Sequence, residues 1–97
     1  MVIQVSFKQV DQSEALMEYI NEKCKKLEKY FRGKLHMVWN VDVTKSEWTA
    51  HCHLLGSHMD YFGEALASDP YQSIDLAISK IEKQVRKRKE ILTRHHE

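Results

Sequence analysis

The chain has 97 residues, which suits a single domain with a modest hydrophobic core. Its composition, 42% hydrophobic and 30% charged, is that of an ordinary globular protein and excludes a disordered or low-complexity chain. No apolar run approaches the roughly 18 residues that a membrane span needs, and the first residues lack the pattern of a signal peptide, so we expect a cytoplasmic protein without membrane contact.

The net charge of +1 conceals a strong segregation of charge along the sequence. Residues 1–22 carry −3 and residues 23–34 carry +5, whereas residues 35–79 carry −5 and residues 80–97 carry +4. Two short segments thus hold 13 of the 15 basic residues. A polyanion meets a local patch rather than an average charge, so the segregation is informative about partners.

The first third of the chain predicts a strand and then a helix. The segment VIQVSF at residues 2–7 alternates between apolar and polar residues, which is typical of a strand with one buried face. Asp11 or Ser13 should then cap a helix that continues to about Phe31 and stops near Gly33. The expected apolar side of this helix consists of Leu16, Ile20, Leu27 and Phe31, flanked by Tyr19, Cys24 and Tyr30.

Three strand-like segments follow, at residues 36–45, 48–55 and 59–67. The turns between them should lie at Ser46-Glu47 and at Gly56-Ser57-His58. Connections this short join antiparallel neighbours, so the three strands should form a meander.

The last element should be a helix that begins after the cap candidates Ser68 and Asp69, with Pro70 at its first position. Its apolar stripe consists of Ile74, Ile78, Ile81, Val85 and Leu92. The order is therefore β-α-β-β-β-α. We expect an α+β fold over residues 1–97, a two-layer sandwich in which both helices pack on one face of a four-stranded antiparallel or mixed sheet.

Catalytic and metal chemistry find little support in the sequence. His51, His53 and His58 are close in sequence, but no pair of cysteines accompanies them, and we expect solvent-facing histidines rather than a metal site. Cys24 and Cys52 should be buried free thiols, with a raised pKa for Cys24. There is no nucleophile with a base at a recognised spacing and no glycine-rich phosphate loop. We therefore expect no cofactor and no enzymatic activity.

The two basic segments, residues 23–34 and 80–97, are open to two interpretations. Lysines on an amphipathic helix usually form a solvated face without a partner. The nearby acidic residues are, however, too few to pair with these bases, and two helices on one side of a sheet would bring both segments onto one layer. The pattern therefore favours a surface for a nucleic-acid backbone.

Two stretches carry a resemblance to a known family. KCKKLEKYFRG begins at Lys23, and SDPYQSIDLAISKIEKQVRKRK begins at Ser68 after the strand segments. Over nearly the whole chain they resemble the ribosome hibernation factors, the group of the bacterial hibernation-promoting factor and the ribosome-associated inhibitor, once called sigma-54 modulation proteins. The expected order of elements is also that of this family, whose fold is similar to double-stranded RNA-binding domains.

The resemblance implies binding to the small ribosomal subunit, in the channel between its head and body. A protein there would overlap the places of mRNA and tRNA and stop translation. Its contacts would be side chains of both helices on rRNA phosphates, and the positions that match the family are Lys23, Lys26, Lys80, Lys83, Gln84, Arg86, Lys87 and Lys89. Lys23 falls among apolar positions of its helix, where the stem can lie along the core while the ammonium group reaches solvent.

Recognition should be of RNA shape and backbone, because no aromatic platform for stacking bases stands out in the sequence. We expect the aromatic residues near the apolar faces to be packing residues, namely Tyr19, Tyr30, Trp39 and Trp48.

Within the family the chain resembles the short hibernation-promoting factors, without a C-terminal dimerisation domain. Such a protein would act with a separate ribosome modulation factor to stabilise inactive ribosome dimers, and we expect the free protein to be a monomer. Three alternatives stay open at this point: a factor like the ribosome-associated inhibitor that blocks dimers, a general double-stranded RNA-binding module, and a protein-interaction module.

Overall fold

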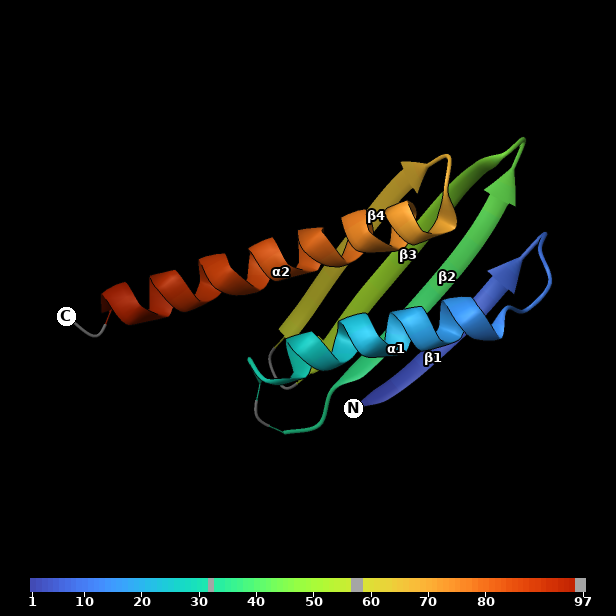
Figure 1. Cartoon of the computed structure of the whole chain (residues 1–97). Helices are drawn as coiled ribbons and strands as arrows, with labels where there is room; N and C mark the ends of the chain where they lie inside the picture. Colours follow the sequence, from blue (N-terminus) through green and yellow to red (C-terminus); the bar gives the residue numbers. More distant parts are fainter. Residues whose placement is uncertain (32, 57–58, 96–97) are drawn as a thin grey trace.

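The computed structural model describes the backbone except at residues 32, 57–58 and 96–97, and it describes side chains as far as residue 88. Six elements follow one another (Figure 1): β1 (Val2–Lys8), α1 (Glu14–Glu28), β2 (His36–Thr44), β3 (Glu47–Gly56), β4 (Met59–Ala67) and α2 (Pro70–His95). The predicted β-α-β-β-β-α order is confirmed. None of the helices in the described residues is long and apolar enough to cross a membrane.

The four strands form one mixed sheet in the order β1-β2-β3-β4. β1 runs parallel to β2, and the other two pairs are antiparallel, as the meander predicted. A parallel pair needs a crossover connection, and α1 is that crossover. The two edges of the sheet are β1 and β4, the first and the last strand in the sequence.

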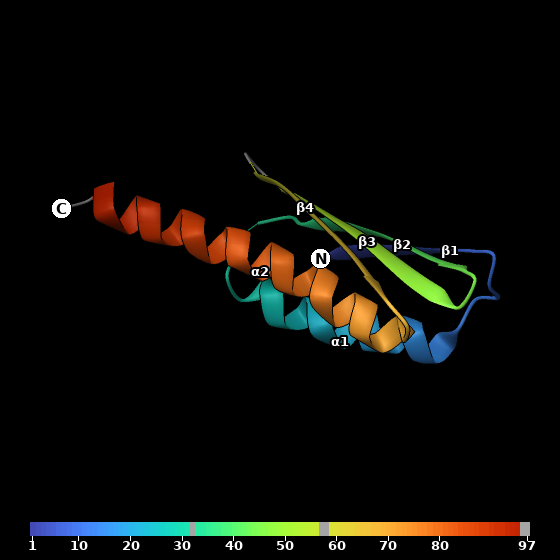
Figure 2. The same cartoon turned by 90° about the horizontal axis from the view of Figure 1, so that it is seen from above.

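Both helices cover the same face of the sheet, which leaves the opposite face uncovered (Figure 2). This confirms the predicted two-layer arrangement. The core lies between the layers, where Trp39, Ile20, Leu27 and Met37 are fully buried. Tyr19, Tyr30 and Trp48 are partly buried against this core, in agreement with their predicted packing role.

α2 approaches the backbone of β4 closely, because Gly63 has no side chain. A Cβ atom at Gly63 would overlap the carbonyl oxygen of Ala77 and would lie 3.4 Å from Cγ1 of Ile81. The predicted stripe of α2 faces this strand, since Ile74, Ile78, Ile81 and Val85 are all buried. The side chain of Leu92, the last residue of that stripe, lies outside the described residues.

The ends of two elements differ from the expectation. α1 ends at Glu28 rather than Phe31, because the next residues form a tighter turn in which the amides of Tyr30 and Phe31 bond to carbonyls three residues back. Lys45 and Ser46 form the β2–β3 turn, and both have left-handed φ values of 51° and 65°. Two such residues make the hairpin turn whose twist matches the strands, so β3 starts at once with Glu47. Ser57 and His58 of the other expected turn lie outside the described residues.

The cap and thiol predictions are confirmed. Ser13 caps α1 by accepting a hydrogen bond from the Leu16 amide, and Asp69 accepts one from the Tyr71 amide at the start of α2. Cys24 and Cys52 are buried free thiols. Burial raises the pKa of the Cys24 thiol to about 11 and also raises the pKa of Cys52, so both thiols stay protonated near neutral pH.

Candidate nucleic-acid interface

α1 and α2 lie side by side and run in the same direction (Figure 1). Residues further along α1 contact residues further along α2. The ring of Tyr19 meets that of Tyr71 edge-on at 4.9 Å between centroids, and the Tyr19 hydroxyl donates a hydrogen bond to Asp75 over 2.6 Å. One turn further along α1, Lys23 Nζ lies 3.6 Å from the same carboxylate. The parallel course decides where the charges of the two helices meet.

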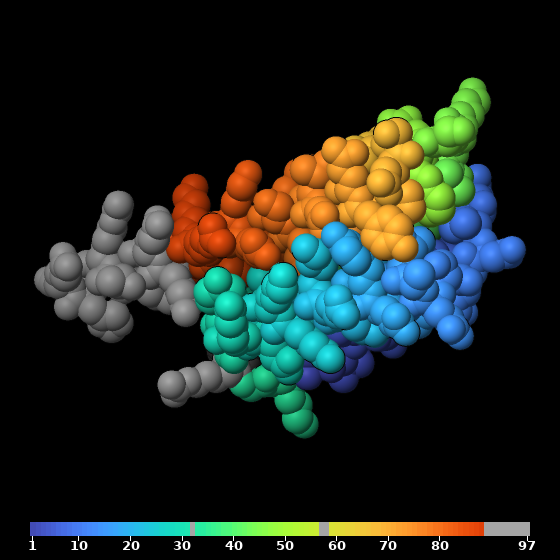
Figure 3. Space-filling model, in the orientation of Figure 1, coloured from blue at the N-terminus to red at the C-terminus, as the bar shows by residue number. Residues whose placement is uncertain are grey.

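In each helix the basic residues gather in the second half. Parallel helices therefore bring the two basic segments to one end of the helix layer, where the surfaces of α1 and α2 adjoin (Figure 3). We call this region the basic end and define it by Lys23, Lys25, Lys26 and Lys29 from α1 and its C-cap, and Lys80, Lys83, Arg86, Lys87 and Arg88 from α2. Cations near a helix C-terminus are also favoured by the helix dipole.

Five of the predicted contact residues are exposed to solvent at the basic end: Lys26, Lys80, Lys83, Arg86 and Lys87. Arg86 lies 4.0 Å from Glu82 one turn earlier, and Glu28 at the end of α1 is occupied by the N-terminal ammonium group at 3.3 Å. Within the described part of the chain, Lys26, Lys83 and Lys87 have no ion pair. Their charges are therefore available to an external anion.

Lys23 has a partner inside the protein. Its ammonium group pairs with Asp75 of α2 and lies 5.3 Å from the centre of the Tyr19 ring, and its side chain is 32% exposed. The Asp75 carboxylate, and to a lesser degree Tyr19, raises the pKa of Lys23 above its ordinary value. Hydrogen bonding to Asp75, together with partial burial, raises the pKa of Tyr19. The unusual place of Lys23 on the helix is thus explained by a bridge between the helices.

Lys80 and Gln84 also bind the protein itself. The ammonium group of Lys80 donates to the carbonyl of Glu64, and Nε2 of Gln84 donates to the carbonyl of Phe62 over 2.8 Å. These carbonyls belong to β4, an edge strand whose outer hydrogen-bonding groups would otherwise be open to another strand. Both side chains therefore satisfy carbonyl groups of the edge strand and hold α2 against β4.

The structure thus divides the eight predicted contact residues. It brings Lys26, Lys83, Arg86 and Lys87 to a common solvent-facing end, and it engages Lys23, Lys80 and Gln84 in contacts within the fold. The side chain of the eighth, Lys89, lies outside the described residues. Asp75 and Tyr19 are participants that sequence reasoning missed, since nothing in the sequence indicates which α1 residue meets which α2 residue.

His51 and His53 lie on the uncovered face of the sheet. His53 contacts Asp60, and His51 Nδ1 lies 3.7 Å from Glu64. The described residues contain no group of three or more histidine, cysteine or carboxylate side chains that could hold a metal ion. His58 lies outside the described residues.

Comparison with known proteins identifies the family. The model of a family described as "Sigma 54 modulation protein / S30EA ribosomal protein" matches residues 3–93. The chain is 30% identical over 97 residues to the ribosome hibernation promoting factor of Escherichia coli K12, covering 98% of this chain and all of that protein. It is also 30% identical over 92 residues to the factor of the same name from Azotobacter vinelandii, covering 93% and 84% of the two chains.

Two solved structures share the fold. The N-terminal domain of Thermus thermophilus Protein Y superposes with a TM-score of 0.84 at 22% identity, over 90% of this chain and 98% of that one. A ribosomal subunit interface protein from Coxiella burnetii superposes with a TM-score of 0.74 at 23% identity, over 93% and 99%. With a family match that spans almost the entire sequence, the chain belongs to the sigma 54 modulation protein / S30EA ribosomal protein family of ribosome hibernation factors, whose members are binding proteins and not enzymes.

Proposed function

We propose that this protein is a cytoplasmic ribosome hibernation factor that binds rRNA of the small ribosomal subunit through its basic end. Bound in the channel of mRNA and tRNA, it blocks translation reversibly. It acts as a single-domain monomer and promotes inactive ribosome dimers together with a separate ribosome modulation factor. The names of its relatives motivate the partner, and the arrangement of charge supports the mode of binding.

The observation that carries the proposal is the convergence of two basic segments, distant in sequence, at one end of the helix layer. Nothing in helix packing requires this coincidence, because antiparallel helices would have put the segments at opposite ends. Lys26, Lys83 and Lys87 are exposed there without an ion pair in the described residues. Cations in such a cluster repel one another, and a phosphate backbone that neutralises them releases counterions on binding.

The shape of this end also suits a nucleic-acid surface. α2 continues past the sheet as a projecting helix (Figure 1), and the molecule as a whole is narrow, with extents of 50 × 22 × 18 Å. A projecting basic helix can reach phosphates on two sides of a groove, whereas a flat face meets only one. Recognition would then be of backbone and shape, the usual mode for folded RNA.

Cosedimentation with isolated small subunits at about 50 and about 200 mM salt tests the proposal. The Lys83→Ala/Lys87→Ala variant should pellet poorly, and the slope of log affinity against log salt should fall by about 1.5, since each lost phosphate contact removes roughly 0.7 to 0.9. The matched control is Lys8→Ala/Lys45→Ala, which removes the same charge far from the basic end. Equal losses in the two variants would show that only net charge matters and would overturn the assignment of this surface.

Two further measurements separate the neighbouring functions. If a free RNA duplex competes as well as the small subunit, the protein is a general double-stranded RNA-binding module. Ribosome profiles on sucrose gradients, with and without added modulation factor, show whether the protein raises the dimer fraction, as proposed, or lowers it, as a factor like the ribosome-associated inhibitor would.

A further inference from the structure

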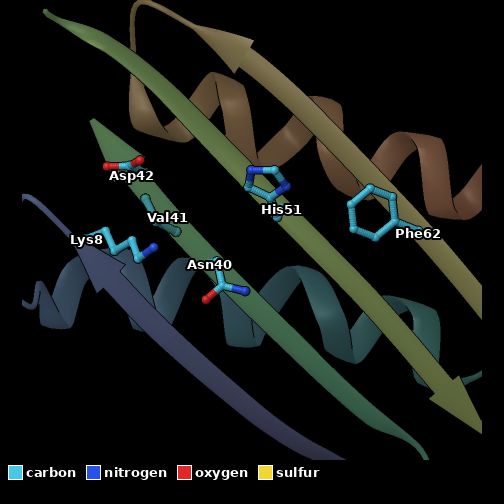
Figure 4. Close-up of a pocket in the computed structure, with 6 residues that line it drawn as sticks. All are labelled: Lys8, Asn40, Val41, Asp42, His51 and Phe62. Atoms are coloured by element: carbon cyan, nitrogen blue, oxygen red, sulfur yellow. The ribbon is translucent and has the colours of Figure 1, made fainter. Parts of the chain in front are cut away.

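The face of the sheet that the helices leave uncovered is chemically distinct from the rest of the molecule. Strand registers place its side chains in rows that cross all four strands. Two rows at its centre run Gln4, Val38, His53, Phe62 and Ser6, Asn40, His51, Glu64. We call this surface the open face. Figure 4 shows part of it, with side chains from β1 to β4 rising on the side away from the helices.

Apolar side chains are concentrated on the open face. Of the six large hydrophobic side chains that are exposed in the described residues, four lie here: Val2, Leu55, Phe62 and Leu66. Phe62 and Leu66 are 51% and 52% exposed and stand on the same side of β4, about 13 Å apart at the usual strand rise. The open face thus carries most of the exposed large apolar side chains in the described residues, spaced along it, with Phe62 and Leu66 on the same strand.

The charge of the open face is opposite to that of the basic end. Its four complete rows carry one lysine, Lys8, against three carboxylates, those of Asp42, Asp60 and Glu64. Lys8, Asp42, His51 and Phe62 line a hollow of about 370 Å³ (Figure 4). Oδ1 of Asp42 is buried at this hollow and accepts no hydrogen bond within the described residues. One oxygen of this carboxylate thus lacks a donor within the described residues.

Phe62 stands at the centre of a group that suits a guanidinium ion. The rings of His51 and His53 flank it with centroid distances of 6.1 and 6.0 Å, and the carboxylates of Asp60 and Glu64 lie two residues before and after it on the same strand face. An aromatic ring attracts a guanidinium over its face, and carboxylates beside the ring accept its fork of hydrogen bonds. Each carboxylate retains free acceptor sites beyond its histidine contact.

We propose that the open face binds a protein segment in which an arginine lies close to an apolar side chain, with Phe62 stacking on the guanidinium, Glu64 and Asp60 pairing with it, and Leu66 receiving the apolar group. The site is independent of the ribosome assignment, because it lies on the opposite layer from the basic end. A factor that holds rRNA with one layer could therefore contact a basic protein with the other.

Charge argues against a nucleic acid on this face. Three carboxylates against a single lysine would repel a phosphate backbone, although exposed rings can stack on bases. The structure also limits how a protein segment can dock. Lys80 and Gln84 occupy two carbonyls of β4, those of Glu64 and Phe62, and a segment that extended the sheet there would have to displace them, whereas the open face is uncovered.

Nuclear magnetic resonance titration of the purified protein, without ribosomes, tests this proposal. The probe is a blocked peptide with one arginine between two leucines, and its twin carries neutral, nearly isosteric citrulline in place of arginine. The arginine peptide should shift the signals of Phe62, His51 and Glu64. Binding should weaken about threefold for the citrulline twin and for Phe62→Ala, as expected for an exposed cation–π contact. The control Leu76→Ala, which removes a 44% exposed leucine from α2, should leave binding unchanged.

Three outcomes would overturn the proposal. Equal binding of the citrulline twin means that the face does not recognise a guanidinium. A short oligouridine that shifts the same signals more strongly than the peptide means that the face binds nucleic acid. Absence of shifts with every probe means that the open face is an ordinary solvated surface. Unchanged spectra of the Phe62→Ala variant outside β3 and β4 would confirm that a loss of binding is not a loss of folding.

Discussion

The two sides of the sheet are built from the same four strands and differ in almost every chemical respect. Toward the helices, the strands present fully buried residues such as Trp39, Val41 and Leu54, and α1 and α2 carry the basic end on their outer surface. Toward solvent, the strands present Phe62 and Leu66 among carboxylates and histidines. Because successive strand residues point to opposite sides, one sequence can specify a core and a second, separate surface at once.

The charges that are segregated along the sequence are also separated in space in the folded chain. The acidic stretch of residues 35–79 supplies most of the open face, and the basic segments supply the end of the helix layer. The near-zero net charge is thus the sum of two surfaces of opposite sign, each suited to a different partner.

The largest expected effect on stability is at Gly63, which follows Phe62 in β4 but faces the helices. Gly63→Ala should lower the free energy of unfolding by about 2–3 kcal/mol, because the new Cβ would force α2 away from β4 at the carbonyl of Ala77. Phe62→Ala should cost less than about 1 kcal/mol, since its ring is half exposed. Urea denaturation measures both, and comparable losses at the two positions would contradict the assignment of a packed side and a solvent side.

A smaller effect on stability should distinguish α2 residues that bond to β4 from α2 residues that only face solvent. Gln84→Ala removes the hydrogen bond to the Phe62 carbonyl and should cost about 1 kcal/mol of stability, without changing the affinity for the small subunit. Its neighbour Lys83→Ala should leave stability within about 0.5 kcal/mol and lower the salt slope by about 0.7 to 0.9.

Thermal or urea unfolding and cosedimentation of both variants provide the measurements. The two substitutions are adjacent and equally truncating, so each serves as the control for the other. If Gln84→Ala instead lowers the affinity for the small subunit while stability is kept, then Gln84 binds RNA as the family resemblance suggested, and the contact with β4 is incidental.

The sequence predicts the elements of this fold well, because each strand and helix carries its own periodicity. Alternation in VIQVSF and the stripe from Ile74 to Val85 each fix which side is buried without reference to the rest of the chain. The β2–β3 turn lies one residue earlier than the predicted Ser46-Glu47. Lys45 and Ser46 adopt left-handed conformations, which neither residue type favours. Such errors stay local and do not change the topology.

The candidate site is harder to predict, because its composition depends on how the helices dock. A lysine that binds a strand carbonyl, such as Lys80, and one that faces solvent, such as Lys83, look alike in sequence. Asp75 meets Lys23 and Tyr19 only through the parallel packing of the two helices. The resemblance to known factors identified the basic segments, but it could not say which of their side chains the fold itself employs.

The smallest effect expected here concerns the bridge between the helices, and it depends on pH. Tyr19 holds its proton more tightly in the folded state, because its hydroxyl donates to the Asp75 carboxylate, so its pKa lies above the ordinary value of 10. A group with a raised pKa contributes stability that is present below the unfolded pKa and is lost as pH rises through the folded pKa. The hydrogen bond should therefore contribute less than about 1 kcal/mol at neutral pH and progressively less above about pH 10.

Asp75→Asn removes this contribution, because the amide still accepts a hydrogen bond but carries no charge to oppose ionisation of Tyr19, and it removes the ion pair with Lys23 as well. The wild type should be slightly more stable than the variant at neutral pH, and the advantage should disappear or reverse as pH rises from about 9 to 11. Urea unfolding at a series of pH values measures the difference, in which ionisation of the buried thiols and of the lysines other than Lys23 largely cancels. Tyr19→Phe removes the phenol, and in that background Asp75→Asn should have a smaller pH-dependent effect, which comes from Lys23 because Asp75 also raises the pKa of that lysine. Parallel stability curves for the wild type and Asp75→Asn would mean that the bridge does not hold in solution, and that Lys23 is as free as Lys83 to bind an external phosphate.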